Sequence, residues 1–301
     1  MNQKRLTAYL LLILTSAIWG IAGPVIKNTL IFIPPFTFLF WRFLLTSIIF
    51  LPLFYWSVKK EKLTLMDILT IAPIGFLGIP LCLSLVFLGF DRTSALDGTI
   101  IATTAPIFIV LAGAFFLKEE VTKLEALGIG VAIAGSLVMV AQPFLEGNAF
   151  AQRNLLGNLL ILCSNLAWTA YVIISKIKLK KYSALTIVTV SFFVGLVAIF
   201  PFALIEQLTI ASSLPFYYFD PAGIWGLLYM IVFSSVVAYF AFESGVKLIE
   251  ASEATLFAYL QPVFAAPVAI FWLKETITLP FLIGSGIIGL GVFLTLWYNQ
   301  S

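Results

Sequence analysis

Charged residues are scarce in this chain, and histidine is absent altogether. Only 10% of its 301 residues are charged and 61% are hydrophobic, whereas a soluble globular protein carries about a quarter charged residues. So little polar surface cannot keep a protein of this size in water. The two cysteines, Cys82 and Cys163, both lie in apolar runs, so no disulfide framework is indicated. The composition therefore predicts an integral membrane protein.

The missing residue types also argue against several functions. An intramembrane enzyme would use an Asp pair, a Ser-His pair or His and Glu metal ligands, and Asp97 is the only Asp expected within a helix. The loops between apolar runs are too short for a nucleotide-binding domain, which excludes an ATP-driven pump. A channel would need a polar lining repeated along a pore, and none is evident. We expect no catalytic residue, metal, cofactor or nucleic-acid partner.

Ten apolar runs are each long enough to cross a bilayer as a helix. A hydrocarbon core about 30 Å thick needs roughly 20 helical residues, whereas barrel strands are about ten residues long with alternating polarity. The first run is full length and shows no cleavage motif, so no cleavable signal peptide is expected. The sequence predicts an all-α membrane protein with helices at 6–26, 36–58, 66–89, 95–117, 124–141, 156–174, 184–205, 223–242, 251–273 and 279–297.

The basic residues predict the orientation of these helices. If the N-terminus is cytoplasmic, twelve basic residues fall at cytoplasmic ends and four at the opposite ends, with Arg42 inside a helix. Such a bias in short loops is typical of membrane proteins, and a missed helix would spoil it. We expect a multi-pass protein of a bacterial inner membrane, with both termini cytoplasmic.

The second half of the chain repeats the first. A shift of 156 residues gives 13 identities over 46 pairs, from Ala95 against Ala251 onward, and places Pro106 on Pro262. Upstream of this region the shift is 149 residues, which places Trp19 on Trp168. Apolar composition alone would not align these distinctive residues.

The repeat predicts two halves of opposite orientation. We divide the chain into a first half, residues 1–146, and a second half, residues 147–301, each with five helices. Because five is odd, the second half must enter the membrane from the other side. Inverted repeats are typical of secondary transporters, which bind cargo near the midplane between the halves and expose it to each side in turn.

Several motifs together resemble a known family. They are Ile18-Trp19-Gly20, Trp41-Arg42-Phe43 and Thr93-Ser94-Ala95, followed by a mid-helix Pro-x-Phe and a Gly-rich closing helix in each half. The chain resembles the EamA-type, ten-helix branch of the drug/metabolite transporter superfamily over its whole length. The resemblance implies export or exchange of amino acids, related metabolites or xenobiotics through a cavity lined mainly by helices 1, 3, 4, 6, 8 and 9. The chain departs from the family pattern at Asp97, Glu253 and Gln261.

Polar and aromatic side chains expected at mid-membrane are the candidate cargo ligands. Small-molecule sites are mostly apolar with a few polar groups, and in a chain that is 15% aromatic the alternative for each ring is plain packing. Ser16 and Trp19 share one face of their helix, as the matching Asn165 and Trp168 do. The full candidate set is Ser16, Trp19, Asn165, Trp168, Tyr239, Tyr259 and Gln261.

Three charged residues are candidate charge or coupling sites. Arg42 lies about two turns inside its helix, where a charge is costly and often functional, although it could also hold helices together. Asp97 and Glu253 occupy equivalent positions in the first turn of their helices. They could carry protons, but an acid in the first turn, as in Ser94-x-x-Asp97, is more simply a helix cap.

Two pairs of equivalent motifs have a structural interpretation beside a functional one. Pro106 and Pro262 fall mid-helix, where proline opens the hydrogen-bond ladder, and could act as hinges or only set shape. The Lys118-Glu119 and Lys274-Glu275 pairs are interpreted as interfacial turns rather than gates.

Small residues four apart, as in Gly128-x-x-x-Ala132 and Ser285-x-x-x-Gly289, predict close helix packing within one chain or along a dimer seam. We therefore expect a monomer or homodimer in the lipid bilayer. The leading functional hypothesis is a secondary transporter that exports or exchanges a small amphipathic metabolite such as an amino acid. The alternative is an exchanger of anionic cargo such as a sugar nucleotide or phosphorylated metabolite.

Overall fold

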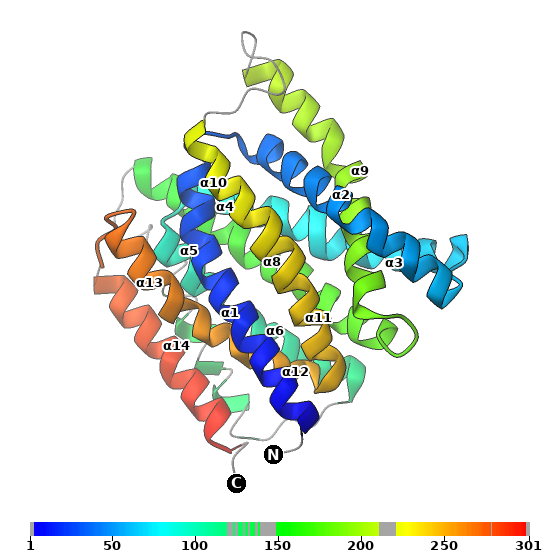
Figure 1. Cartoon of the computed structure of the whole chain (residues 1–301). Helices are drawn as coiled ribbons and strands as arrows, with labels where there is room; N and C mark the ends of the chain where they lie inside the picture. Colours follow the sequence, from blue (N-terminus) through cyan, green and yellow to red (C-terminus); the bar gives the residue numbers. More distant parts are fainter. Residues whose placement is uncertain are drawn as a thin grey trace.

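The protein is a bundle of long helices that run side by side (Figure 1). The computed structural model describes residues 3–118, 149–210, 221–277 and 279–298, together with 123, 126–128, 130–131, 133–135 and 138. Within these residues every regular element is helical, which confirms the predicted all-α class. The start of α1 and the end of α14 lie at the same end of the bundle (Figure 1), which we call the terminal end.

Among the described residues, eight helical spans are long and apolar enough to cross a membrane. Two shorter apolar stretches, parts of Ala126–Gly135 and Leu282–Gly291, occupy the fifth and tenth predicted positions. The elements are α1 (Gln3–Thr29), α2 (Pro35–Glu61), α3 (Leu65–Phe76), η1 (Leu77–Leu81), α4 (Cys82–Arg92), α5 (Ala95–Ala102), α6 (Ala105–Ala112), η2 (Gly113–Leu117), α8 (Ala149–Lys178), α9 (Ala184–Ile210), α10 (Pro221–Tyr229), η3 (Met230–Val237), α11 (Ala238–Leu248), α12 (Ala251–Thr255), η4 (Leu256–Leu260), α13 (Gln261–Phe271) and α14 (Leu279–Tyr298).

Several spans consist of consecutive helical segments of different winding. The third span is α3, η1 and α4, and the eighth is α10, η3 and α11, where η1 and η3 are π-helical. Such π turns widen the helix and are common at functional sites. With the repeat shift of 156 residues, the π turns of the two spans overlap.

The fourth and ninth spans are broken at equivalent places. A turn at Thr103 and Thr104 separates α5 from α6, and the 3₁₀ segment η4 separates α12 from α13. Pro106 and Pro262 each lie in the first turn after the break, where a missing N–H breaks no helical bond. The prolines were expected in the middle of continuous helices; they instead start a second helical segment.

Aromatic side chains pack the two halves together. The longest interface joins α2 to α9, where the ring of Phe192 contacts those of Phe43 and Phe50 with centroids 5.8 Å apart. Large apolar side chains such as Phe115 and Trp225 remain exposed, each at 79%. An apolar outer surface over an apolar core fits a protein surrounded by lipid.

The predicted interfacial turns are present where they are described. Lys118 and Lys274 both end their helices in the left-handed conformation, with φ of 59° and 57°. Glu275 accepts hydrogen bonds from the N–H groups of Ala95 and Leu96 at 2.7 and 2.9 Å, so it caps α5 of the other half. Glu119 lies outside the described residues.

The small-residue pattern contributes to packing within the chain. A Cβ on Gly135 would lie 3.0 Å from the carbonyl oxygen of Gly284 on α14, so these helices approach closely. Around Gly286 and Gly289 there is open space at that position. Ala132 lies outside the described residues, and whether the open stretch of α14 forms a dimer seam stays a prediction.

Candidate functional site

A cavity of about 150 Å³ lies in the centre of the bundle, between the two halves. A single water molecule needs roughly 10–15 Å³ of such space, so the cavity has room for a small molecule. Its walls come from spans 1, 2, 3, 4, 6, 8 and 9. Eight of the residues proposed from sequence line it: Ser16, Trp19, Arg42, Pro106, Asn165, Trp168, Tyr239 and Gln261.

Four of the proposed residues lie elsewhere. Tyr259 and Pro262 belong to the broken ninth span but are not among the lining residues. Asp97 and Glu253 lie in the first turns of α5 and α12, toward opposite ends of the bundle. The structure therefore brings six of the seven proposed cargo ligands together, without Tyr259, and separates the two acids from them.

An aromatic cluster forms the middle of the cavity wall. The rings of Trp19 and Trp168, which are equivalent in the repeat, meet edge to face with centroids 5.4 Å apart. Tyr239 contacts Trp19 at 5.2 Å and Trp168 at 5.9 Å, also edge to face. Phe242 contacts both tryptophans as well. The edge-to-face arrangement leaves parts of the ring faces for a ligand, and such faces attract both apolar groups and cations.

Each half holds the broken helix of the other half. The hydroxyl of Ser16 on α1 donates to the carbonyl oxygen of Phe257 at 2.6 Å, and the amide of Asn165 on α8 donates to that of Ile101 at 3.0 Å. Asn165 also donates to Thr104 Oγ1 at 3.0 Å. A helix break frees carbonyl groups that need partners, and Ser16 and Asn165 supply them from the cavity wall.

Arg42 is the only charged residue among the described residues that line the cavity. It is 1% exposed, and its Nε and Nη2 atoms donate to Ser235 Oγ at 2.7 Å and Ser234 Oγ at 3.2 Å. Both serines belong to the π segment η3. The sequence predicted that Arg42 lies within the membrane but could not show that it lines the cavity.

The two proposed coupling acids make contacts at helix ends. Glu253 accepts hydrogen bonds from Arg5 at 2.8 Å and from the hydroxyl of Tyr9, so it joins α12 to the start of α1 at the terminal end. At the other end, the N–H of Asp97 donates to Ser94 Oγ at 2.9 Å, so Ser94 is the cap of α5. These contacts suit capping and end closure; proton coupling by either acid stays a prediction.

Glu243 is a buried acid that the sequence interpretation missed. It lies on α11, is 0% exposed, and interacts with the neighbouring side chains of Tyr171 and Ser175. Tyr171 in turn stacks on Trp168 with ring centroids 5.0 Å apart, which links Glu243 to the cavity wall. The predicted eighth helix stopped at Phe242 because the apolar run stops there, whereas the helix continues to Leu248.

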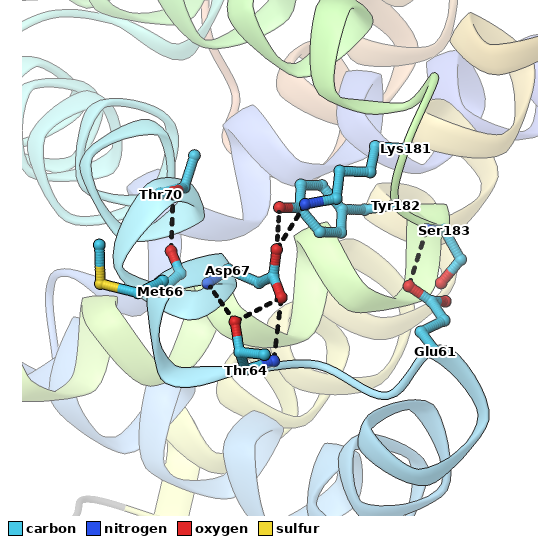
Figure 2. Close-up of polar contacts among 8 residues, drawn as sticks. All are labelled: Glu61, Thr64, Met66, Asp67, Thr70, Lys181, Tyr182 and Ser183. Carbon is cyan, nitrogen blue, oxygen red and sulfur yellow. Dashed lines mark hydrogen bonds and ion pairs between the residues drawn. The ribbon is translucent and has the colours of Figure 1, made fainter.

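A polar cluster joins the two halves at the terminal end. Figure 2 shows Lys181 and Tyr182, from the loop between α8 and α9, converging on the carboxylate of Asp67, where each donates a hydrogen bond of 2.6 Å. Asp67 also forms a capping box with Thr64 at the start of α3. The hydrogen bond to Asp67 raises the pKa of Lys181 above its usual value. These residues fix the helix ends; they lie apart from the cavity.

A helical membrane bundle around a mostly apolar cavity, with broken helices at its centre, is an arrangement typical of transporters. Within the described residues no group of His, Cys, Asp and Glu side chains could hold a metal ion. The model of the EamA-like transporter family matches residues 6–141 and again residues 155–297. The chain belongs to the EamA-like transporter family.

Two relatives span nearly the whole chain. An uncharacterized transporter of Archaeoglobus fulgidus is 28% identical over 295 residues, which cover 98% of both proteins. The uncharacterized transporter YetK of Bacillus subtilis is 30% identical, over 97% of this chain and 88% of its own length. One solved crystal structure covers 99% of both chains with a TM-score of 0.67 at 16% sequence identity, which shows a shared fold.

Proposed function

We propose that the protein is a secondary transporter that exports or exchanges a small amphipathic metabolite of the amino-acid type by alternating access. The observation that carries this proposal is the central cavity, whose described lining consists of apolar and aromatic side chains, a few hydrogen-bonding groups and one cation. An amino acid presents the matching chemistry, because it combines a carboxylate, an ammonium group and an apolar side chain in a small volume.

The contacts between the halves supply a route for alternating access. Trp19 and Trp168 meet between the halves, and Ser16 and Asn165 each tie one half to the broken helix of the other. At the terminal end, Glu253 ties α12 to α1. Exchange of such contacts between two equivalent arrangements would open the cavity toward one end while closing it toward the other.

The cavity favours this cargo over multiply charged anions. A sugar nucleotide or phosphorylated metabolite carries at least two negative charges, and Arg42 is the only cation among the described lining residues. Burying a second, uncompensated charge would cost several kcal/mol. Singly charged or zwitterionic cargo avoids that cost.

Counterflow in proteoliposomes tests the proposal. Vesicles that contain the purified full chain are loaded with one unlabelled L-amino acid and diluted into a trace of the same labelled compound, for each amino acid in turn. We expect transient accumulation of at least one of them above the level in protein-free vesicles. A matched panel of sugar nucleotides and sugar phosphates tests the alternative cargo. Accumulation only in that panel would refute the amino-acid type, and none in either would refute the cargo class.

The orientation of the protein needs a separate test, because the predicted cytoplasmic termini rest on the basic residues alone. With Cys82 and Cys163 replaced, a single cysteine in place of Lys60 should be protected from an impermeant thiol reagent in intact cells. A cysteine in place of Asn148, which lies outside the described residues, should react. Reversed labelling would overturn the orientation without affecting the cavity.

A further inference from the structure

Arg42 carries a buried positive charge that the described part of the chain does not neutralise. The side chain is 1% exposed, and no ion pair of Arg42 with an acidic side chain is found among the described residues. The ionisable groups that interact with its charge are the phenol of Tyr239 and the thiol of Cys82, both neutral at physiological pH. An unpaired cation inside a membrane is costly, so it persists where function requires it.

The guanidinium also has one nitrogen whose hydrogen-bonding capacity is unused. Its Nε donates to Ser235 and its Nη2 makes a longer bond of 3.2 Å to Ser234, whereas Nη1 has no hydrogen-bond partner among the described residues. Phe87 lies beneath the planar group, 5.8 Å from the ring centroid. The two serines and the ring thus fix the orientation of the guanidinium, while its Nη1 donors stay available for a ligand.

The aromatic residues of the cavity lining suit the remainder of a small organic acid. Trp19, Trp168 and Tyr239 present ring faces that accept an apolar group or an ammonium group. Thr99 also lines the cavity, and its hydroxyl has no hydrogen-bond partner among the described residues. Together these walls provide one anion-binding point, an aromatic surface and a free hydroxyl.

We propose that Arg42 binds the carboxylate of the cargo, which makes the cargo a small acid with one carboxylate. This inference deepens the proposed function and rests on it. A guanidinium and a carboxylate match in geometry, since two parallel N–H donors face two oxygens. Cargo binding then supplies the negative charge that Arg42 lacks in the empty cavity.

The first test needs no knowledge of the cargo. If Arg42 binds an anionic cargo, its charge lacks a counterion in the empty protein and carries a desolvation cost. Arg42→Gln removes that cost, so it should leave the thermal midpoint of the empty protein unchanged or raise it. If Arg42 serves only to bind Ser234 and Ser235 together, Arg42→Gln should lower the midpoint. A lowered midpoint would therefore overturn the inference. Arg92→Gln, an arginine outside the cavity lining, is the matched control for loss of one arginine.

The second test compares acids with their amides. L-leucine and L-phenylalanine are each titrated against the wild-type protein in nanodiscs. Leucinamide and phenylalaninamide, in which a neutral carboxamide replaces the carboxylate, are titrated in parallel. We expect the acids to raise the thermal midpoint and the amides to bind roughly 10- to 100-fold more weakly. Arg42→Gln should lose the response to the acids, Arg42→Lys should keep part of it, and Arg92→Gln should keep all of it.

The outcomes separate this inference from the proposed function. Equal responses to acids and amides in the wild-type protein would overturn the role of Arg42 even if Arg42→Gln does not fold. Inorganic phosphate is the third probe, and stabilisation by phosphate but not by the acids would also overturn a carboxylate site. Acid-specific binding without any counterflow would leave the site intact and refute transport. If no probe binds, the thermal midpoint of the empty Arg42→Gln protein is the deciding measurement. A midpoint below that of the wild-type protein overturns the inference.

Discussion

The two halves of the molecule build the same scaffold but place different chemistry on it. Lys27 at the end of α1 donates to the carbonyl oxygen of Phe90, and Lys176 at the end of α8 donates to that of Val246. Lys176 and Val246 occupy the positions that the repeat aligns with Lys27 and Phe90. The contacts that hold helices in place are therefore repeated.

The charged positions break this symmetry. Arg42 lies beside Phe87, whereas the equivalent positions of the second half carry Ser191 and the buried acid Glu243. The space beside them is filled by the ring of Tyr171. The first half thus places a cation on the cavity, and the second half places an acid behind its aromatic wall. The difference teaches that the two halves share the contacts that position their helices and differ in the charged groups near the cavity.

The largest expected effect comes from Gly78, the position equivalent to Ser234. A Cβ there would lie 2.2 Å from Cδ2 of the buried Tyr171 ring, which cannot move aside. We expect Gly78→Ala to destabilise the protein by about 1–3 kcal/mol through overpacking, measured as a lower thermal midpoint in detergent. Gly286→Ala, with no atom within 4 Å of the added Cβ, is the control and should change little. Equal midpoints in the two variants would contradict the close packing of Tyr171 on η1.

The next largest effect compares Asn165 with its counterpart Ser16. Asn165→Ala removes two hydrogen bonds at the break of the fourth span, whereas Ser16→Ala removes one at the break of the ninth. At about 1 kcal/mol per bond, Asn165→Ala should be the more destabilising by about 1 kcal/mol, and both should slow counterflow. Chemical denaturation and transport are measured on the same preparations. The reverse order of stability would show that the two breaks are not held in the same way.

Glu243 should respond to neutralisation by becoming more stable. The carboxylate is fully buried, and neither oxygen has a partner with good hydrogen-bond geometry among the described residues. Glu243→Gln keeps the shape and removes a chargeable group, so we expect a gain of about 0.5–2 kcal/mol. Glu61→Gln is the control, because Glu61 accepts a hydrogen bond from the N–H of Ser183 at the terminal end. This variant should lose stability rather than gain it. A large loss in Glu243→Gln would mean that the acid holds the helices together.

The smallest effects are expected at Glu253 and Asp97. Arg5, the partner of Glu253, is 57% exposed in its side chain, and such pairs contribute about 0–1 kcal/mol. Glu253→Gln and Asp97→Asn should therefore shift the thermal midpoint only slightly and leave the response of transport to an imposed pH gradient unchanged. Loss of that response in either variant would assign proton coupling to the acid and reverse the capping interpretation.

Much of the architecture was predictable because bilayer-spanning helices carry a strong sequence signal. Long apolar runs can satisfy their backbone only as helices in lipid, so the starts at Ala95, Ala184 and Ala251 match the structure to the residue. The ends were less predictable, since a span can extend past its last apolar residue into charged ones. That is why the eighth helix was drawn too short and Glu243 was missed.

The cavity set was predictable in part because the repeat pairs residues that face a common axis. Trp19 and Trp168, aligned by the 149-residue shift, meet in the structure at 5.4 Å. Tyr259 was chosen on composition and helical position alone; it lies in the 3₁₀ segment η4 and is not among the lining residues. Local winding depends on hydrogen bonds from other helices, which one sequence does not show.

By itself the sequence determined the all-α membrane class, the internal repeat and the presence of an intramembrane cation, because apolar runs, matched residues and charged residues can all be located along the chain. Only the tertiary structure decided that Arg42 lines the cavity with one nitrogen unpaired. It also decided that Ser16 and Asn165 hold the broken helices, and that Glu243 is buried beside Tyr171, which stacks on Trp168. Those facts depend on how spans far apart in the chain meet. Charge compensation is a property of neighbours in space, so it is fixed by packing rather than by order along the chain.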